Sequence, residues 1–304
     1  MNKTNPNFEA IVNLHWFNNI VRKEQLHAKE GHWVSLSGID ANDNWSFTEE
    51  WGSHAETGQQ KTWDWTADER LQLFYKETKT DPSQLPGKLV LDAGCGNGQL
   101  SRAIASAGAY VVGIDKQAHL PKGEEKCQFV QCDFDDPPFL KESFDIIIAN
   151  GSIHHTKNTF QSFQSLAKLV KPGGKFYVWV YKKQAGGKKL LTKALDVSRF
   201  FISRFPSGLQ KFTVNRLTDF FYLLSRIRKG ENSRRSKEEI RVNTYDAFTP
   251  LYRHYHSKEE VSGWFRQCGF EDIEVTHDNN RYGFGMVGIK GLKAGSILAP
   301  PPLL

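Results

Sequence analysis

The sequence predicts an α/β fold in which a mostly parallel sheet carries helices on both faces. Short apolar runs alternate with helical patterns from residue 88 to residue 181, an order that is typical of parallel sheets. The first of these runs, Leu89–Leu91, leads into three alternating glycines and then into a helical pattern that begins at Gln99. We therefore expect residues 87–181 to form the core of the fold.

Residues 1–86 are expected to form a helical and aromatic cap. A helix is predicted over Asn7–Glu30, because a proline precedes it and apolar residues recur at helical spacing. Six of the eight tryptophans lie at or before residue 65, so this segment could cover a cofactor or form a substrate wall; a small core under a loop explains them equally well. Thr66 and Glu69 form a capping box, which predicts the start of a further helix.

The glycines at Gly94, Gly96 and Gly98 lie in the predicted strand-to-helix turn. Glycine accepts backbone angles that other residues resist, and it lets a ligand approach the main chain beside a helix N-terminus. A tight turn without a ligand is the simpler alternative. The dinucleotide fingerprint G-x-G-x-x-G is excluded, because its last glycine position, counted from Gly94, holds Gln99.

Acidic residues end the next two predicted strands. The strand Tyr110–Ile114 is closed by Asp115, whose carboxylate could accept hydrogen bonds from both ribose hydroxyls of an adenosine ligand. The strand Cys127–Cys132 is followed by Asp133 and Phe134. Capping of a turn is the alternative role for each carboxylate. Dinucleotide-binding enzymes also use a carboxylate at the end of this strand to bind ribose hydroxyls, so Asp115 does not distinguish between classes of adenosine-containing cofactor.

Two adjacent histidines follow the clearest buried strand, Phe144–Asn150. His154 and His155 should lie at the carboxyl edge of the sheet, where open α/β folds place their ligands. An imidazole suits deprotonation of a hydroxyl or ammonium nucleophile, since its pKa lies near neutrality. Helix capping or packing against the turn is the alternative role for either histidine. A metal site is not expected here, because no carboxylate ligand is evident beside the two histidines.

The remaining core elements are predicted from helical spacing and from glycine and proline signals. A helix at Thr159–Val170 ends at the sequence K-P-G-G, and a strand follows at Lys175–Tyr181. The closing part, residues 257–290, contains a helix at Ser257–Cys268 and two strands, Glu271–His277 and Tyr282–Lys290. Residues 291–304, rich in Gly, Ala and Pro, are expected to form a flexible tail.

These features together resemble the class I S-adenosylmethionine-dependent methyltransferases of the small-molecule type. The resemblance covers residues 88–181 and rests on G-x-G-x-G after an acidic residue, acidic residues after the next two strands, the His-His pair and K-P-G-G before the fifth strand. It implies a Rossmann-like sheet of seven strands in the order 3-2-1-4-5-7-6, with strand seven antiparallel. It also implies S-adenosylmethionine as the cofactor.

The resemblance carries specific roles to residues of this chain. Asp92 matches the carboxylate that orients the methionine part of the cofactor, Asp133 matches the residue that receives the adenine amino group, and Phe134 matches the residue that packs on the adenine ring. His154 and His155 match the catalytic pair. The implied cofactor-binding residues are Asp92, Gly94, Cys95, Gly96, Gly98, Asp115, Lys116, Asp133, Phe134 and Asn150.

Residues 182–256 form a basic insertion with two amphipathic segments, Leu190–Phe205 and Leu209–Ile227. Residues 182–241 contain 16 Lys or Arg and five Asp or Glu, whereas the whole chain carries a net charge of +6. The helices could act as a lid over an acceptor pocket, touch an anionic membrane and reach a lipid acceptor, or neutralise the phosphates of a nucleic acid. A nucleic acid is the less favoured partner, because no Asn-Pro-Pro-Tyr-like tetrapeptide stands at residues 150–153.

An aromatic and imidazole cluster precedes the last predicted helix. Its hydroxyl and imidazole groups could orient a polar acceptor, and ordinary packing explains it as well. The members are Tyr245, Tyr252, His254, Tyr255 and His256.

Composition narrows the class of protein. The four cysteines form no C-x-x-C pair, so reduced thiols and no metal site are expected. No signal-peptide core or membrane-length apolar run is present, which favours a cytoplasmic protein, and no motif predicts an oligomeric state.

The function predicted from these patterns is methyl transfer from S-adenosylmethionine to a small-molecule acceptor, with oxygen as the leading acceptor atom. An RNA or lipid methyltransferase that uses the basic insertion is one alternative. A non-catalytic S-adenosylmethionine-binding protein is another.

Overall fold

A computed structural model of the chain describes residues 14–37, 66–184, 187–229, 236–279 and 282–292. The strands are β1 (Leu26–Lys29), β2 (His32–Ser35), β3 (Leu89–Ala93), β4 (Tyr110–Asp115), β5 (Cys127–Gln131), β6 (Phe144–Asn150), β7 (Val170–Tyr181), β8 (Phe270–Asn279) and β9 (Gly283–Lys290). The α-helices are α2 (His15–Asn18), α4 (Ala67–Thr78), α5 (Gln99–Ser106), α6 (Thr159–Ala167), α7 (Gly187–Ile202), α8 (Ser207–Lys229), α9 (Lys237–Phe248) and α10 (Lys258–Gln267). Single-turn 3-10 helices are η1 (Lys23–Gln25), η2 (Pro82–Gln84) and η3 (Ile153–His155).

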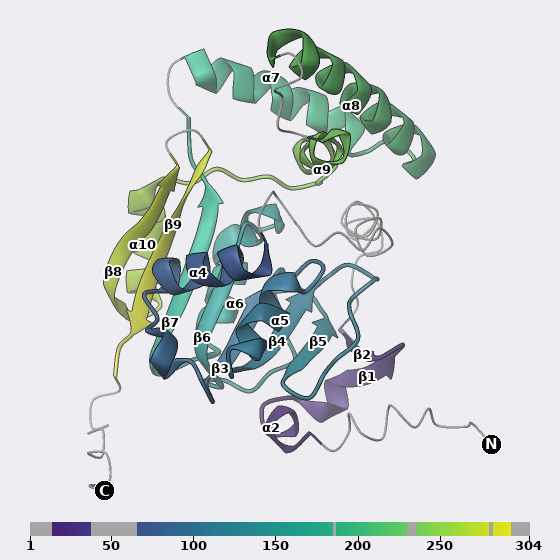
Figure 1. Cartoon of the computed structure of the whole chain (residues 1–304). Helices are drawn as coiled ribbons and strands as arrows, with labels where there is room; N and C mark the ends of the chain where they lie inside the picture. Colours follow the sequence, from purple (N-terminus) through teal and green to yellow (C-terminus); the bar gives the residue numbers. More distant parts are fainter. Residues whose placement is uncertain (1–13, 38–65, 185–186, 230–235, 280–281, 293–304) are drawn as a thin grey trace, which may run out of the picture.

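The sheet has nine strands in the order β1-β2-β5-β4-β3-β6-β7-β9-β8, so the prediction of seven strands is wrong (Figure 1). Seven of these strands, β5-β4-β3-β6-β7-β9-β8, are arranged in the expected order 3-2-1-4-5-7-6. The pairs from β2 to β7 are parallel, and β9 is antiparallel to both β7 and β8. The two additional strands are an antiparallel hairpin whose second strand pairs with β5.

The hairpin replaces the N-terminal helix that was expected over residues 7–30. In the described part of that range, only α2 and the single turn η1 are helical before β1 begins. Glu30 and Gly31 both have positive φ, 50° and 95°, as a two-residue hairpin turn requires. The helical spacing of apolar residues was therefore misleading here, and the two-residue turn at Glu30 and Gly31 determines the local structure.

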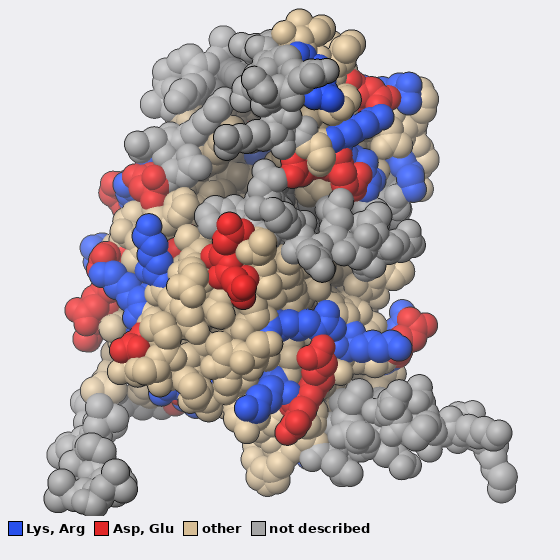
Figure 2. Space-filling model, in the orientation of Figure 1, with Lys and Arg blue, Asp and Glu red and all other residues tan. Residues whose placement is uncertain are grey.

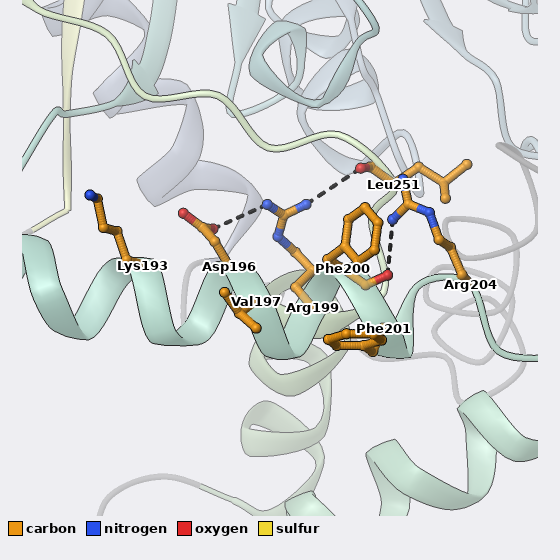
Figure 3. A pocket seen from close by; sticks show the side chains of 8 residues that line it. All are labelled: Lys193, Asp196, Val197, Arg199, Phe200, Phe201, Arg204 and Leu251. Atoms are coloured by element: carbon orange, nitrogen blue, oxygen red, sulfur yellow. Dashed lines mark hydrogen bonds and ion pairs between the residues drawn. The ribbon is translucent and has the colours of Figure 1, made fainter.

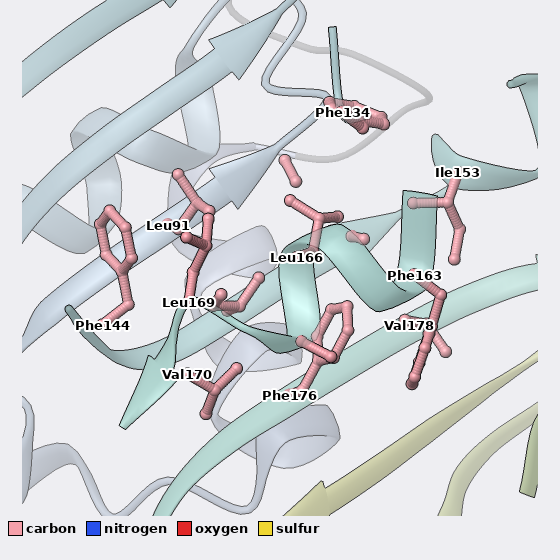
Figure 4. Close-up of a cluster of buried hydrophobic side chains, with 14 of the residues drawn as sticks. Leu91, Phe134, Phe144, Ile153, Phe163, Leu166, Leu169, Val170, Phe176 and Val178 are labelled. Carbon is pink, nitrogen blue, oxygen red and sulfur yellow. The ribbon is translucent and has the colours of Figure 1, made fainter. Parts of the chain in front are cut away.

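Helices cover both faces of the sheet, as expected for parallel strands that are buried on both sides. One buried cluster joins strand residues to α6 and α10, and Phe163 of α6 stacks on Phe176 of β7 with ring centroids 4.8 Å apart (Figure 4). The other cluster joins alternate strand residues to α4 and α5, for example Phe74, Leu100 and Ile104. The capping box of Thr66 and Glu69 is present at the start of α4.

The basic insertion contains three described helices, and they lie beyond the carboxyl edge of the parallel strands (Figure 1). Helices α7 and α8 match the two predicted amphipathic segments. Helix α9 was not predicted, although Ser236 and Glu239 form a capping box at its start. Among the described helices, none is both long and apolar enough to cross a membrane.

The closing elements follow the prediction. Helix α10 begins at a capping box of Ser257 and Glu260, and the antiparallel strands β8 and β9 come after it. Helix α6 ends at Ala167, earlier than expected, because β7 already begins at Val170 and pairs there with Phe144. Residues 38–65, with four of the tryptophans, and residues 293–304 lie outside the described residues.

Candidate active site

The glycine turn joins β3 to α5 and packs directly against the loop that follows β6. Gly94 has φ of 90° and Gly98 has φ of 72°, both in the region that favours glycine. A Cβ atom at Gly94 would lie 2.2 Å from Cβ of Ser152, and one at Gly98 would lie 2.6 Å from Cζ of Phe129. Only glycine fits these two positions, so the turn can pack this closely against Ser152 and Phe129.

Asp92 and Asp115 place two buried carboxyl groups beside this turn. Ser101 Oγ donates to Asp92 Oδ2 at 2.6 Å, and the Gly96 amide donates to Asp115 Oδ2 at 2.9 Å. Burial raises the pKa of Asp92 to about 6, against the lowering effects of Ser101 and of the Arg70 charge. Burial also raises the pKa of Asp115. The site therefore favours a ligand that supplies a positive charge and hydroxyl donors.

The raised pKa of Asp92 predicts a stability that depends on pH. Because the folded pKa lies above the ordinary value of 3.8, the folded protein holds this proton more tightly and loses stability as the pH rises from about 4 to about 6. Asp92→Asn keeps an acceptor for Ser101 and removes the titration. We expect the variant to exceed the wild type in free energy of unfolding by about 2–3 kcal/mol at pH 8 and by much less at pH 4.

Urea denaturation of the ligand-free protein at several pH values measures this difference. A difference between variant and wild type that stays constant from pH 4 to pH 8 would contradict the prediction.

The other predicted cofactor residues lie along the same edge. Asp133 follows β5, and its Oδ1 accepts from the Asp135 amide at 3.0 Å. Phe134 is buried, with Cζ 3.6 Å from the position of a Cβ at Gly94. Asn150 is exposed at the end of β6. The structure thus brings Phe134 to the glycine turn and leaves Asn150 at the rim.

Lys116 and Cys95 occupy supporting positions. The Lys116 carbonyl accepts from Gln131 Nε2 at 3.1 Å, and the Cys95 amide donates to the Ile114 carbonyl at 3.0 Å. Burial raises the pKa of the Cys95 thiol well above its usual range. All four cysteines are free, and no group of three or more His, Cys, Asp or Glu within the described ranges could hold a metal ion.

His155 is held by contacts at both ring nitrogens. Its Nδ1 lies 3.0 Å from the Tyr252 carbonyl oxygen, and its Nε2 lies 3.3 Å from Asp246 Oδ1. A carbonyl oxygen and a carboxylate are both hydrogen-bond acceptors, so both ring nitrogens of His155 face acceptor groups. Although burial would raise the pKa of Asp246, the hydrogen bond and charge of His155 hold that pKa well below its usual range.

His154 differs from its neighbour in having no hydrogen-bond partner at either ring nitrogen among the described residues. The side chain is fully buried, and its ring centroid lies 4.3 Å from those of both His155 and Tyr181. Burial, followed by the charge of His155, lowers the pKa of His154 well below its usual range. His154 is therefore a neutral imidazole with one open acceptor and one open donor.

The aromatic and imidazole cluster divides into two parts. His256 contacts Glu260 and Thr159 through its two ring nitrogens and packs edge-on against Trp264, while His254 Nε2 lies 3.0 Å from the Thr156 carbonyl. Ordinary packing accounts for His256, whose two ring nitrogens are both in contact, and for Nε2 of His254.

Tyr252 and Tyr255 lie close to His155 and to Tyr181, respectively. The Tyr252 carbonyl holds His155, and the Tyr255 ring centroid lies 6.0 Å from that of Tyr181. Tyr245 is buried in α9, under Arg241.

The sequence analysis did not identify four residues that contribute to this site. Tyr181 Oη donates to Asp246 Oδ2 at 2.6 Å, and the Arg253 guanidinium lies 4.3 Å from the Tyr181 ring centroid. Arg70, half-buried in α4, acts on Asp92 through its charge. No local motif marks Asp246 or Arg70, whereas Tyr181 and Arg253 stand beside elements that were already singled out.

These positions fit S-adenosylmethionine. The turn at Gly94 and Gly98 has no room for side chains, and the buried carboxyl groups of Asp92 and Asp115 lie beside it, where they could accept hydrogen bonds from an ammonium group and from hydroxyls. The cofactor class is therefore supported by the shape and chemistry of the turn itself.

Comparison with known proteins agrees with this geometry. Residues 91–178 match the family model described as a methyltransferase domain. The chain is 23% identical over 239 residues to demethylmenaquinone methyltransferase of Clavibacter sepedonicus, covering 76% of this chain and 84% of that protein. It is 31% identical over 157 residues to the ubiquinone biosynthesis O-methyltransferase of Glaesserella parasuis serovar 5, covering 47% of this chain and 64% of that protein.

Other relatives match over shorter parts. A probable tRNA methyltransferase 9B of Homo sapiens is 30% identical over 133 residues, 41% of this chain and 26% of that protein. Haemonchus contortus phosphoethanolamine N-methyltransferase 2 in complex with S-adenosyl-L-methionine superposes with a TM-score of 0.52 at 14% identity, covering 84% of this chain and 61% of that one. Residues 91–178 therefore match a methyltransferase domain, and the chain shares its fold with this solved methyltransferase.

Proposed function

We propose that the protein transfers a methyl group to a hydroxyl of a small-molecule acceptor and that His154 is the base. The observation that carries this proposal is the buried His154 ring with both nitrogens unpartnered among the described residues. A buried polar group without a partner is costly, and an acceptor hydroxyl would supply the missing hydrogen bond. Because its pKa is lowered, His154 keeps its lone pair at neutral pH.

His155 has a positioning role in this proposal. Both of its ring nitrogens already contact acceptors, the Tyr252 carbonyl oxygen and Asp246, so neither nitrogen is left open for an acceptor hydroxyl. Its ring packs against His154 at 4.3 Å and fixes the plane of that imidazole. Asp246 in turn is held by the Tyr181 hydroxyl, so three elements fix the orientation of one ring.

The cofactor supplies an activated methyl group on a sulfonium, so the protein contributes mainly by positioning. Asp92 and the amides of the glycine turn would hold the methionine part, and Asp115 would hold the ribose hydroxyls. Asp133 and Phe134 would hold the adenine, with Cys95, Gly96, Lys116 and Asn150 completing the surface around it.

The acceptor in this proposal is aromatic or otherwise apolar around its hydroxyl. Trp179, Tyr181 and Tyr255 provide rings near His154, and Arg253 provides a positive charge over Tyr181. The relatives named for demethylmenaquinone and for ubiquinone biosynthesis support a small-molecule acceptor. The O-methylation itself, a cytoplasmic location and an acceptor of lipid character stay predictions.

We also propose the division of labour that the sequence suggested. Residues 87–181 and 257–290 form the cofactor-binding core. Residues 182–256 form a lid over the acceptor side. The ion pair between Asp246 of α9 and His155 supports a lid that takes part in the site.

An RNA acceptor is the second candidate, and the likeness to the tRNA methyltransferase is the observation in its favour. That likeness covers only a quarter of the human protein, so it includes little beyond the cofactor-binding part. A non-catalytic binding protein would keep the glycine turn and lack turnover.

Incubation of the purified protein with methyl-labelled S-adenosylmethionine and a cell extract tests these alternatives. We expect label in a small-molecule fraction soluble in organic solvent, as a base-stable ether, and not in the nucleic-acid fraction. Label in nucleic acid that ribonuclease removes would favour the RNA acceptor. Cofactor binding without transfer to any fraction would favour the non-catalytic alternative.

A further inference from the structure

Helix α8 leaves a row of apolar residues exposed to solvent. Gln210, Val214 and Thr218 are buried on its inner side. The exposed apolar residues, named here the α8 stripe, are Leu209, Phe212, Phe220, Leu223, Leu224 and Ile227. Their spacing keeps them on one side of the helix over about 27 Å. A surface helix normally buries such a stripe, so this one is built to meet a partner.

Helix α7 adds a second apolar surface. A hollow of about 590 Å³ lies along it, between the apolar side chains of Val197, Phe200 and Phe201 and Leu251 of the connecting segment (Figure 3). Val197 and Phe201 are each 59% exposed. Ten of the 14 exposed large hydrophobic residues in the described part of the chain lie on α7 and α8. The apolar surface of the molecule is therefore concentrated on this pair of helices.

Basic residues accompany these apolar surfaces. The two helices contain nine Lys or Arg and only two acidic residues, Asp196 and Asp219. Asp196 pairs with Arg199, and Asp219 pairs with Arg216 and with Lys237. Lys and Arg side chains lie beside uncharged surface where Figure 1 places α8 (Figure 2).

Several of the guanidinium groups lie against aromatic rings of their own helix. The Arg204 guanidinium lies 3.8 Å from the Phe200 ring centroid, and that of Arg216 lies 5.8 Å from the Phe212 ring centroid. Aromatic rings next to cationic heads are typical of helices that lie at a lipid–water interface.

We propose that α7 and α8 bind the surface of a membrane that contains anionic lipids. A second copy of this chain fits less well, because its equally basic helices would face these. A nucleic acid would require basic side chains where the α8 stripe presents Phe, Leu and Ile. An anionic bilayer satisfies both features, since its headgroups match the charge and its acyl region receives the apolar side chains.

The proposed membrane-binding surface is connected to the candidate site through α9. Helix α9 packs beside α7 and α8 and carries Asp246, which contacts His155 (Figure 1). Membrane docking would therefore bring the acceptor side of the site close to the lipid. The docking surface rests on its own observations and does not depend on which acceptor is methylated.

Co-sedimentation with vesicles tests the proposal. The probes are phosphatidylcholine vesicles with and without phosphatidylglycerol at about one part in three. We expect binding to the anionic vesicles, weaker binding to neutral ones, and a decrease at high salt. The triple variant Phe212→Ser, Phe220→Ser, Ile227→Ser should bind the anionic vesicles at least about tenfold more weakly.

The matched control replaces three exposed leucines elsewhere, Leu36→Ser, Leu140→Ser and Leu292→Ser, and should bind like the wild type. Thermal unfolding and S-adenosylmethionine binding, measured for all proteins, report whether each variant is folded. The proposal is overturned if the wild type stays in solution with anionic vesicles, or if the stripe variant binds as the control does. A wild-type dimer that the stripe variant converts to a monomer would instead identify a second copy as the partner. None of these readouts requires methyl transfer, so failure of the proposed reaction leaves the result standing.

Discussion

His154→Gln is expected to lower kcat by about 100-fold or more while the Kd for S-adenosylmethionine stays within about twofold. Glutamine keeps a polar side chain of similar reach but cannot accept a proton at neutral pH. Since burial lowers the pKa of His154 well below its usual range, the wild-type rate should also stay flat from pH 6 to pH 8, where this ring is already neutral. Initial rates with a phenolic acceptor, and calorimetry with the cofactor, measure the two quantities.

His155→Gln is the matched comparison. This change removes the imidazole of the His155–Asp246 ion pair and should lower the free energy of unfolding by about 3 kcal/mol, because the largely buried Asp246 carboxylate loses the partner that holds its pKa low. The restoring variant is His155→Gln combined with Asp246→Asn, in which the buried charge is gone. Turnover that survives in His154→Gln and is lost in the folded double variant would reassign the base to His155.

Gly94→Ala is expected to have the largest effect on the fold and on cofactor binding. The added Cβ meets Ser152 Cβ at 2.2 Å, and the residue must also keep φ of 90°. We expect a loss of about 3 kcal/mol or more in the free energy of unfolding and at least about a tenfold weaker affinity for S-adenosylmethionine. Urea denaturation and calorimetry give these values.

Gly87→Ala separates the two causes. Gly87 has φ of 77°, and nothing lies within 4 Å of its Cβ position, so only the backbone cost of about 1 kcal/mol should remain. Combining Gly94→Ala with Ser152→Gly should recover most of the difference, because the atom that clashes is removed. A double variant as unstable as Gly94→Ala alone would show that the contact with Ser152 is not the cause.

The core of the fold could be predicted because each of its strands is an apolar run closed by a glycine, proline or acidic residue. The polar residues at the ends of these strands then share one edge, so the positions of Asp92, Asp115 and His154 followed from topology alone. The β1–β2 hairpin could not be predicted in the same way, since each strand has four residues and the preceding helical spacing favoured a helix. Helix α9 was not predicted, because its many charged residues obscure an amphipathic pattern. Its capping box, however, can be recognised in the sequence.

The partner of His155 illustrates what local patterns leave out. Asp246 lies on a helix that no motif singled out, and only the packing of the insertion on the sheet edge brings it within 3.3 Å of the imidazole. Arg70 and Asp92 are separated in the same way, on α4 and β3. Contacts of this kind depend on tertiary packing, and neither residue type nor spacing along the chain reveals them.

The β1–β2 hairpin also determines how the sheet ends. Without it, β5 would be an edge strand of five buried residues, open to pairing with a strand from another molecule. The hairpin moves that edge to β1, which has four residues and ends in Lys29. At the opposite edge, β8 carries two register shifts and a positive φ at Asp272. Both margins are thus short or irregular, which disfavours the strand-to-strand aggregation that a long apolar edge would invite.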